Sequence, residues 1–116
     1  MKYPVLLTRD ARNDLEDIYD YIAAADSSQQ AEVRLGELNE ALASLSHFPE
    51  RGACPYELQE MGIRTFRQNF LKPYRIIYQV IEKQVIVFLI ADGRRDMQTL
   101  LLRRLLGGSP PEGKLF

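Results

Sequence analysis

The residues of this sequence that are best suited to chemistry are arginines in its second half. Arg75 lies within one apolar segment, Arg94 and Arg95 follow the end of the next, and Arg64 and Arg67 precede both segments. A guanidinium is permanently charged and binds phosphate or carboxylate oxygens through two parallel hydrogen bonds. If the two apolar segments form neighbouring strands, Arg75, Arg94 and Arg95 can converge near one face of a sheet. We therefore predict an anion-binding surface there, for a phosphodiester or for a row of carboxylates.

A structural role is the alternative for these arginines. Arg95 could pair with Asp92 or Asp96 and so fix the end of its strand. Arg75 has no acidic neighbour within its own strand, which favours a functional role for its guanidinium. Both interpretations stay open for Arg94 and Arg95.

Few other residues are arranged for catalysis or for metal binding. His47 is the only histidine and Cys54 the only cysteine, so they can build neither a zinc site nor an intramolecular disulfide. The sequence has no recognisable Ser-His-Asp arrangement and no glycine-rich phosphate-binding motif. We therefore expect neither a metal nor a cofactor.

The composition is that of one globular domain with a marked charge asymmetry. The 116 residues are 46% hydrophobic, and no apolar run is long enough to span a membrane, so we expect a cytoplasmic protein. Residues 1–62 carry five Lys and Arg against twelve Asp and Glu, a net charge of −7. Residues 63–116 carry ten against four, a net charge of +6. The basic half is expected to face an anionic partner, either nucleic acid or an acidic protein segment; the alternative is that these charges only solvate the surface.

Hydrophobic periodicity predicts the order of the elements. Residues 3–7 have the pattern of a strand, and Thr8 is placed to cap the helix that follows. Apolar residues at helical spacing predict two helices, of which the second begins at a Ser27–Gln30 capping box and ends at Phe48. A loop, three strands and a short apolar helix are then predicted at residues 50–62, 63–70, 74–81, 85–91 and 97–106.

This order, β-α-α-β-β-β with a short terminal helix, is typical of an α+β fold. We expect a helical hairpin packed on one face of a small, mainly antiparallel sheet, with the other face available. The last helix should fold back on the domain or bind a partner. Residues 1–106 are expected to form a single domain, and the Gly- and Pro-containing residues 107–116 a flexible tail.

Several segments together resemble the RelE/ParE superfamily of bacterial toxins from type II toxin–antitoxin modules. They are spread over residues 3–106 and read LTRDARNDLEDIYDYI, HFPERG, PYELQEMGIR, YRIIYQV, ADGRRD and LLLRRLL. The fold of the superfamily is the one predicted above. Its RelE-like members cut messenger RNA on the ribosome, whereas its ParE-like members poison DNA gyrase.

Different segments resemble the two branches. The strand pair that starts at YRIIYQV is similar to RelE, and in a ribonuclease Arg75, Arg95 and Arg64 would be the catalytic residues. However, Leu101 occupies the position of a tyrosine in RelE, and Phe66 stands where one lysine would be. Arginines without a group that moves the 2′-hydroxyl proton should give little cleavage. The segment DLEDIYDYI, the link from PERG to EL, and GRRD are more similar to ParE.

The resemblance therefore implies a ParE-like toxin that inhibits growth by poisoning DNA gyrase and is not an enzyme. A RelE-like ribonuclease acting on messenger RNA at the ribosome is the first alternative, and a non-toxic antitoxin-binding homologue is the second. The sequence pI of about 5.8 is low for these usually basic toxins, which favours a target recognised as protein.

The resemblance also implies a cognate antitoxin that wraps the domain as an extended segment with a helix, in a toxin–antitoxin hetero-oligomer. We expect target or antitoxin binding at five arginines and at two leucines of the last helix, namely Arg64, Arg67, Arg75, Arg94, Arg95, Leu101 and Leu105.

Overall fold

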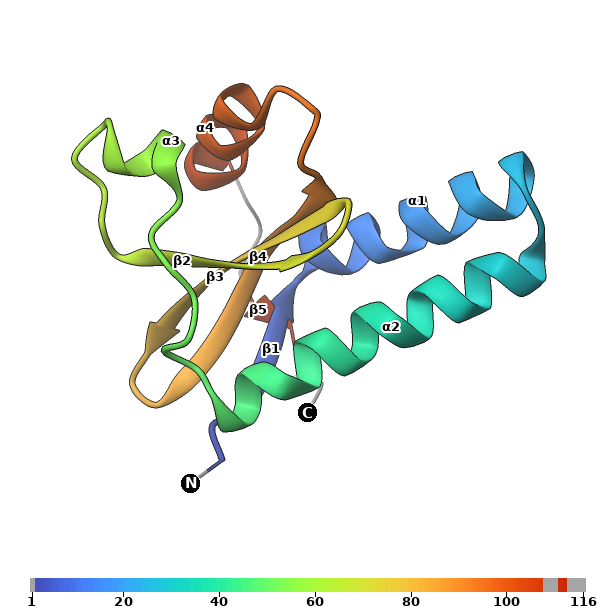
Figure 1. The fold of residues 1–116 in the computed structure, drawn as a ribbon. Helices are drawn as coiled ribbons and strands as arrows, with labels where there is room; N and C mark the ends of the chain where they lie inside the picture. The colour runs from blue at the N-terminus through green and yellow to red at the C-terminus, as the bar shows by residue number, and fades with distance from the viewer. Residues whose placement is uncertain (1, 108–110, 113–116) are drawn as a thin grey trace.

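The structure is a computed structural model that describes residues 2–107 and 111–112, and it has an α+β fold (Figure 1). The helices are α1 (Arg9–Ala25), α2 (Ser28–His47), α3 (Tyr56–Gln59) and α4 (Met97–Gly107). The strands are β1 (Val5–Thr8), β2 (Phe66–Leu71), β3 (Tyr74–Ile81), β4 (Gln84–Asp92) and β5 (Pro111–Glu112). The predicted order is confirmed, and α3 and β5 are two short additions to it.

The strands form one sheet in the order β2-β3-β4-β1-β5. β1 runs parallel to β4, with Val5 opposite Val85, and every other pair of neighbours is antiparallel. The sheet is therefore mainly antiparallel, as predicted. β2 begins at Phe66 instead of residue 63, because the N–H of Ile63 closes a turn after α3 by donating to the carbonyl of Leu58 at 2.9 Å.

The end of the chain returns to the sheet. Gly107 is the last residue of α4, and Pro111 and Glu112 pair antiparallel with Thr8 and Leu7. The remainder of the predicted flexible tail, residues 108–110 and 113–116, lies outside the described residues. β1 consequently has a neighbouring strand on each side.

The two long helices are capped as the sequence predicts. The Thr8 hydroxyl accepts a hydrogen bond from the N–H of Ala11 at 3.1 Å, and the Ser27 hydroxyl accepts one from Gln30 at 3.1 Å. Each cap satisfies a backbone donor that the first turn of a helix leaves unpaired. Among the described residues, no helix combines the length and the hydrophobicity that a membrane crossing would need.

The helices cover both faces of the sheet, and each face has its own apolar core. The helical hairpin buries one cluster, made of Val5, Leu7, Ala11, Leu15, Leu38, Leu42, Leu45, Tyr74, Ile76, Tyr78, Val85, Val87 and Ile90. α3 and α4 cover the opposite face and bury Leu58, Phe66, Ile77, Leu89, Ala91, Met97 and Leu101. The expectation that this second face stays available is therefore wrong. β3 and β4 carry large apolar side chains on both faces, so both faces must be covered.

Candidate functional site

Arg75 lies on the sheet face that α3 and α4 cover, and four hydrogen bonds hold its guanidinium. Nη1 and Nη2 donate to the two carboxylate oxygens of Glu57 at 2.8 Å each, and Nε donates to the side-chain oxygen of Gln68 at 2.9 Å. The hydrogen bond from Arg75 is the main cause that lowers the pKa of Glu57. Arg75 has no acidic neighbour within β3, as the sequence shows, but a carboxylate from α3 binds it, so the lack of a neighbour in the strand does not favour a functional role.

The same contacts position α3. This helix has only four residues and no side-chain cap, so its own hydrogen bonds hold it weakly. Burial of Leu58 and the ion pair of Glu57 attach it to the sheet. On the other side, a Cβ at Gly93 would lie 2.9 Å from Cδ of Arg75, so glycine is needed where the backbone passes the arginine stem. Arg75 thus supports the fold at the junction of β3, α3 and the end of β4.

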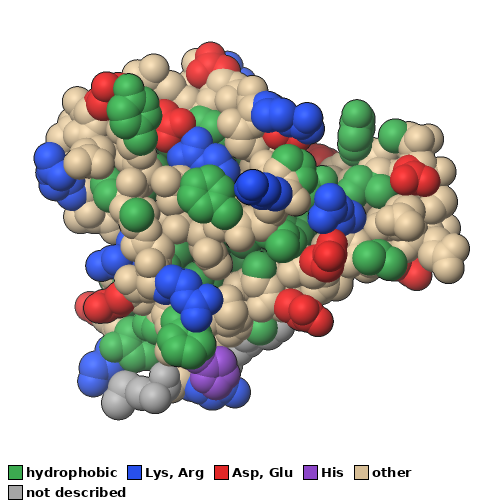
Figure 2. All heavy atoms as spheres, in the orientation of Figure 1, with side chains coloured by type: hydrophobic (Ala, Val, Ile, Leu, Met, Phe, Trp, Pro, Cys, Tyr) green, Lys and Arg blue, Asp and Glu red, His purple; other side chains and the backbone are tan. Residues whose placement is uncertain are grey.

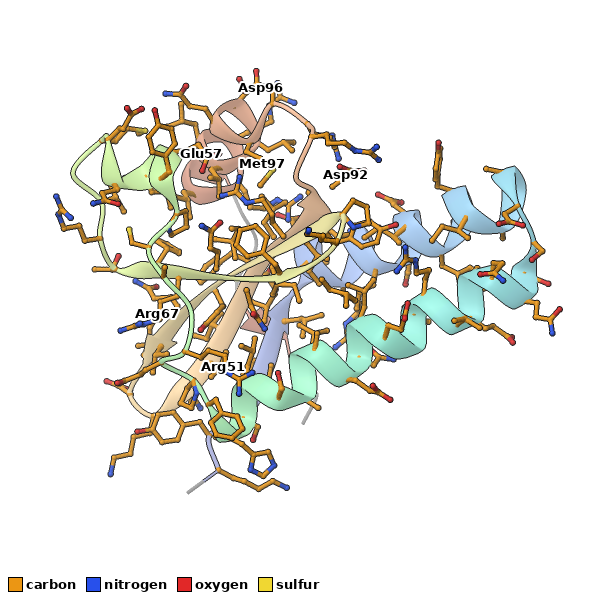
Figure 3. The ribbon with its side chains drawn as sticks, in the orientation of Figure 1. Arg51, Glu57, Arg67, Asp92, Asp96 and Met97 are labelled. Carbon is orange, nitrogen blue, oxygen red and sulfur yellow. The ribbon has the colours of Figure 1, made fainter. Side chains whose placement is uncertain are left out.

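Arg94 and Arg95 share a cavity that Arg75 does not line. Both line a cavity beside α1, and Figure 3 shows Asp92 nearer to α1 and Glu57 beside α3. Nε and Nη2 of Arg94 donate to the Asp92 carboxylate at 3.0 and 2.6 Å. This pairing lowers the pKa of Asp92 to about 2. The strand-end ion pair predicted for Arg95 is therefore made by Arg94. The convergence of Arg75, Arg94 and Arg95 on one ligand stays a prediction.

Asp96, the second candidate partner of Arg95, has another role. Its carboxylate accepts hydrogen bonds from the backbone N–H and the hydroxyl of Thr99 at 3.2 and 2.8 Å, which lowers its pKa. Asp96 therefore caps the start of α4. The exposed side chain of Arg95 forms no hydrogen bond or ion pair with the residues that the structure describes.

Asp14 and Arg104 form a network that the sequence analysis did not predict. Nη1 and Nη2 of Arg104 donate to the Asp14 carboxylate at 2.8 and 3.0 Å, and Nη1 also donates to the carbonyl of Phe88 at 2.7 Å. The Asp14 carboxylate in turn accepts from the N–H of Ile90 at 2.9 Å. Burial is the largest influence on the pKa of Asp14 and raises it.

This network occupies the edge of β4 that β1 leaves open. β1 pairs with β4 only as far as Val87, because the chain then turns into α1. The next backbone groups on that edge, at Phe88 and Ile90, are bonded by the side chains of Arg104 and Asp14 instead. The ion pair thus connects α4, α1 and the sheet.

Beside this network, a groove runs between α1 and the ends of β3 and β4. Its main cavity of about 430 Å³ is lined by Asp14, Asp17, Ile18, Tyr21, Tyr74, Ile90, Ala91, Asp92, Arg94 and Arg95. A second cavity of about 310 Å³ continues it toward α2 and is also lined by Tyr21 and Tyr74, with Ile22, Ala25, Asp26, Gln30, Arg34 and Pro73. We call these two cavities together the α1–β4 groove.

The main cavity of the α1–β4 groove combines apolar walls with charged side chains of both signs. Ile18, Ile90 and Tyr74 supply apolar walls, and Tyr21 is 74% exposed. Asp14 and Asp92 are each paired with an arginine, as described above. Among the described residues, the Asp17 and Arg95 side chains have no such partner and leave one negative and one positive charge at the rim of the main cavity. Such a surface suits a protein segment with an apolar side chain and charges of both signs.

The remaining predicted site residues are not in the groove. Arg64 is exposed, whereas Nη1 of Arg67 donates to the carbonyls of Glu50 and Gly52 at 3.0 and 2.8 Å. Leu101 is 1% exposed within the core of α3 and α4, and Leu105 packs against that core. In the view of Figure 2, Lys and Arg side chains are spread over the sheet and its loops, while the projecting end of the hairpin shows few.

No group of His, Cys, Asp or Glu side chains within the described residues could hold a metal ion. The described residues offer two surfaces for molecular recognition, the α1–β4 groove and the exposed arginines. Among the residues that line the main cavity, the sequence predicts Arg94 and Arg95 as binding residues. It does not predict Asp14, Asp17 and Tyr21, which have the pattern of the solvated side of a helix. The exposed tyrosine among these acidic residues is the one signal that could have indicated a binding surface.

The comparisons with known proteins agree on one kind of protein. Residues 5–97 match the family described as the ParE toxin of the type II toxin-antitoxin system parDE. Toxin ParE3 of Caulobacter vibrioides is 27% identical over 97 residues, which cover 84% of this chain and 93% of that protein. A solved structure of the chromosomal ParDE TA system from P. aeruginosa has the same fold, with a TM-score of 0.66 at 20% identity over 78% of this chain and 96% of that one.

Proposed function

Because the chain belongs to the ParE toxin family of type II toxin–antitoxin systems, we propose that it inhibits growth by poisoning DNA gyrase in the cytoplasm. We also propose that a cognate antitoxin neutralises it by binding in a hetero-oligomer. The similarity to a protein of a ParDE toxin–antitoxin system supports such a partner. Gyrase as the target follows from the resemblance to the ParE branch.

The hydrogen bonds of the Arg75 guanidinium are the observation that favours gyrase poisoning over RNA cleavage. A ribonuclease of the RelE type needs this guanidinium for the scissile phosphate, but here its donors are bonded to Glu57 and Gln68. A phosphate would have to displace an internal carboxylate at this position. The carboxylate is also a poor general base, since its pKa is lowered by the same arginine. This supports a toxin that acts by binding.

The antitoxin is proposed to bind the α1–β4 groove. An apolar side chain of the antitoxin would fill the main cavity between Ile18 and Ile90, and its flanking charges would meet Arg95 and Asp17. The sequence predicts that Leu101 and Leu105 contact the antitoxin. Because both side chains pack against the core beneath α4, they can contact the antitoxin only if α4 is displaced. We therefore place the first contact at the groove.

A two-part assay on the purified protein tests the target. Gyrase is assayed for supercoiling with detection of cleaved DNA, and messenger RNA on translating ribosomes is mapped by primer extension. We expect inhibited supercoiling with linearised DNA and intact message. Message cut at the ribosomal A site with unaffected gyrase would refute the proposal and would require Arg75 to exchange Glu57 for a phosphate.

Calorimetry with the antitoxin tests the groove. Arg95→Ala is expected to weaken the complex by about 0.5–1 kcal/mol as a charge at the rim of an interface, and Ile18→Ala by more than about 1 kcal/mol. Arg103→Ala is the matched control, because Arg103 is also exposed but lines neither cavity of the groove. Equal affinities of the Ile18→Ala variant and the unchanged protein, both shown to be folded, would exclude the groove as the antitoxin site.

A further inference from the structure

The turn between α2 and α3 displays a stacked pair of planar groups at the end of the molecule remote from the α1–β4 groove. The Phe48 ring is 55% exposed, and the exposed guanidinium of Arg51 lies over it with Cζ 4.4 Å from the ring centroid. Figure 3 shows Arg51 beside the C-terminal end of α2, far from Asp92. The pair lines a cavity of about 420 Å³ together with Tyr3, Pro49 and Glu50. We call this surface the Phe48–Arg51 corner.

The backbone of the corner is held firmly against the sheet. The N–H of Gly52 donates to the hydroxyl of Tyr78 at 3.0 Å, and Arg67 donates to the carbonyls of Glu50 and Gly52. A Cβ at Gly52 would lie 2.4 Å from the carbonyl oxygen of Gln68, so the turn needs glycine for this close approach. An exposed ring on a fixed backbone loses little entropy when a ligand covers it. The corner is therefore preorganised for binding.

The charge around the corner is positive although the protein as a whole has a net charge of −1. Arg51 lines the cavity and Arg67 bonds the carbonyl of Glu50, whereas Glu50 is the one carboxylate in the cavity wall, so two cations face one anion. The last turns of α2, residues 41–47, contain no carboxylate. The acidic part of the helical hairpin therefore lies away from this surface.

We propose that the Phe48–Arg51 corner binds single-stranded nucleic acid. Bases stack on aromatic rings and on guanidinium planes, and the N–H edge of a guanidinium suits a phosphate. A base in the cavity contacts Phe48 and Arg51 while its phosphate meets the surrounding cations. The Glu50 carboxylate repels phosphates, so few phosphates are contacted at once. The same carboxylate can accept a hydrogen bond from the amino group of a base.

A protein segment is the other class of ligand that an exposed ring could bind. Nucleic acid is favoured because its backbone brings a negative charge with every nucleotide to this cationic surface. The α1–β4 groove differs in this respect, since its lining carries four carboxylates against three arginines. The corner also requires neither gyrase nor antitoxin, so its test is independent of the proposed target.

Fluorescence anisotropy of a labelled single-stranded oligodeoxynucleotide, titrated with the purified protein over a range of salt concentrations, tests the proposal. Phe48→Ala is expected to weaken binding about fivefold or more, as loss of base stacking does. Arg51→Ala should weaken binding. It should also make the slope of the logarithm of the binding constant against the logarithm of the salt concentration less steep by about 0.7, the value for one phosphate contact on a single strand. Phe70→Ala is the matched control, because Phe70 is 59% exposed and lies 6.0 Å from the guanidinium of Arg75.

The unchanged protein should also bind a duplex of the same sequence more weakly than the single strand, because paired bases cannot stack in the cavity. Equal affinity for both forms would overturn the stacking assignment, as would unchanged binding by Phe48→Ala. Absence of measurable binding to the oligonucleotide overturns the proposal as well. If Phe48→Ala and Arg51→Ala then weaken gyrase or antitoxin binding, the corner is a protein contact instead.

Discussion

Removal of the Glu57 carboxylate should destabilise the protein because it leaves the Arg75 guanidinium without its main partner. The two side chains are 11% and 20% exposed, Arg75 being the more buried. A hydrogen bond to a charged group contributes about 1.5–3 kcal/mol, and breaking a fully buried ion pair costs about 3–5 kcal/mol. Gln68 still accepts from Arg75 and the pair is partly hydrated, so we expect Glu57→Ala to lower the free energy of unfolding by about 2–3 kcal/mol.

A double-mutant cycle in urea isolates the contribution of this pair. Arg75→Met removes the charge and keeps an apolar stem next to Gly93. If the ion pair anchors α3, the double variant should be less destabilised than the sum of the single variants, with a coupling of about 1–2 kcal/mol. Free energies that add within about 0.5 kcal/mol would refute the anchoring role of Arg75.

The contribution of the Glu57 carboxylate to stability should depend on pH in a defined direction. The pKa of Glu57 is lowered in the folded protein from its usual 4.5, mainly by the hydrogen bond from Arg75. A lowered carboxylate pKa gives stability that is fully present above the unfolded pKa and is lost as the pH falls through the folded pKa. The difference in stability between the unchanged protein and Glu57→Ala should therefore be constant near neutral pH and shrink below pH 4.5.

Two further substitutions test the packing of the helices. Gly36 lies exposed in the middle of α2, and a Cβ there would meet nothing within 4 Å, so Gly36→Ala should raise the free energy of unfolding by about 0.4–1 kcal/mol; an unchanged urea midpoint would contradict this. Leu101→Ala should lower it by about 2–5 kcal/mol, because Leu101 is buried between α4 and the sheet. If Leu101→Ala instead weakens antitoxin binding without any loss of stability, α4 is displaced in the complex.

The order of the elements could be predicted from the sequence because its signals are local. The caps at Thr8 and Ser27 and the apolar periodicity of the hairpin each lie within one helix. α3 could not be predicted in this way, since four residues contain no periodicity and the helix is held by a contact between residues 18 positions apart. β5 was missed for a similar reason, as its two residues pair with the far end of the sequence.

The candidate site was harder to predict than the fold. Target or antitoxin binding by the arginines stays a prediction, and the sequence could not show which residues of the chain each arginine contacts. Arg75 and Arg94 turned out to bind carboxylates of the same domain, and the search within one strand could not find Glu57. No partner is predicted for Arg104, because it lies in an apolar helix and its partner, the carboxylate of Asp14, is 90 positions away. Ion pairs of this kind depend on tertiary structure and leave no spacing pattern.

The parallel pairing of β1 with β4 also determines how late during translation the protein can complete its fold. Val5 pairs with Val85, 80 residues later, and Asp14 meets Arg104 after 90. Contacts of such long sequence separation require closure of a large loop and form slowly. During translation α1 and α2 emerge before their sheet exists, so an unfinished chain is an unsupported acidic hairpin. The groove, and any activity that depends on it, arises only when nearly the whole chain has been made, and an antitoxin already present can meet it at that moment.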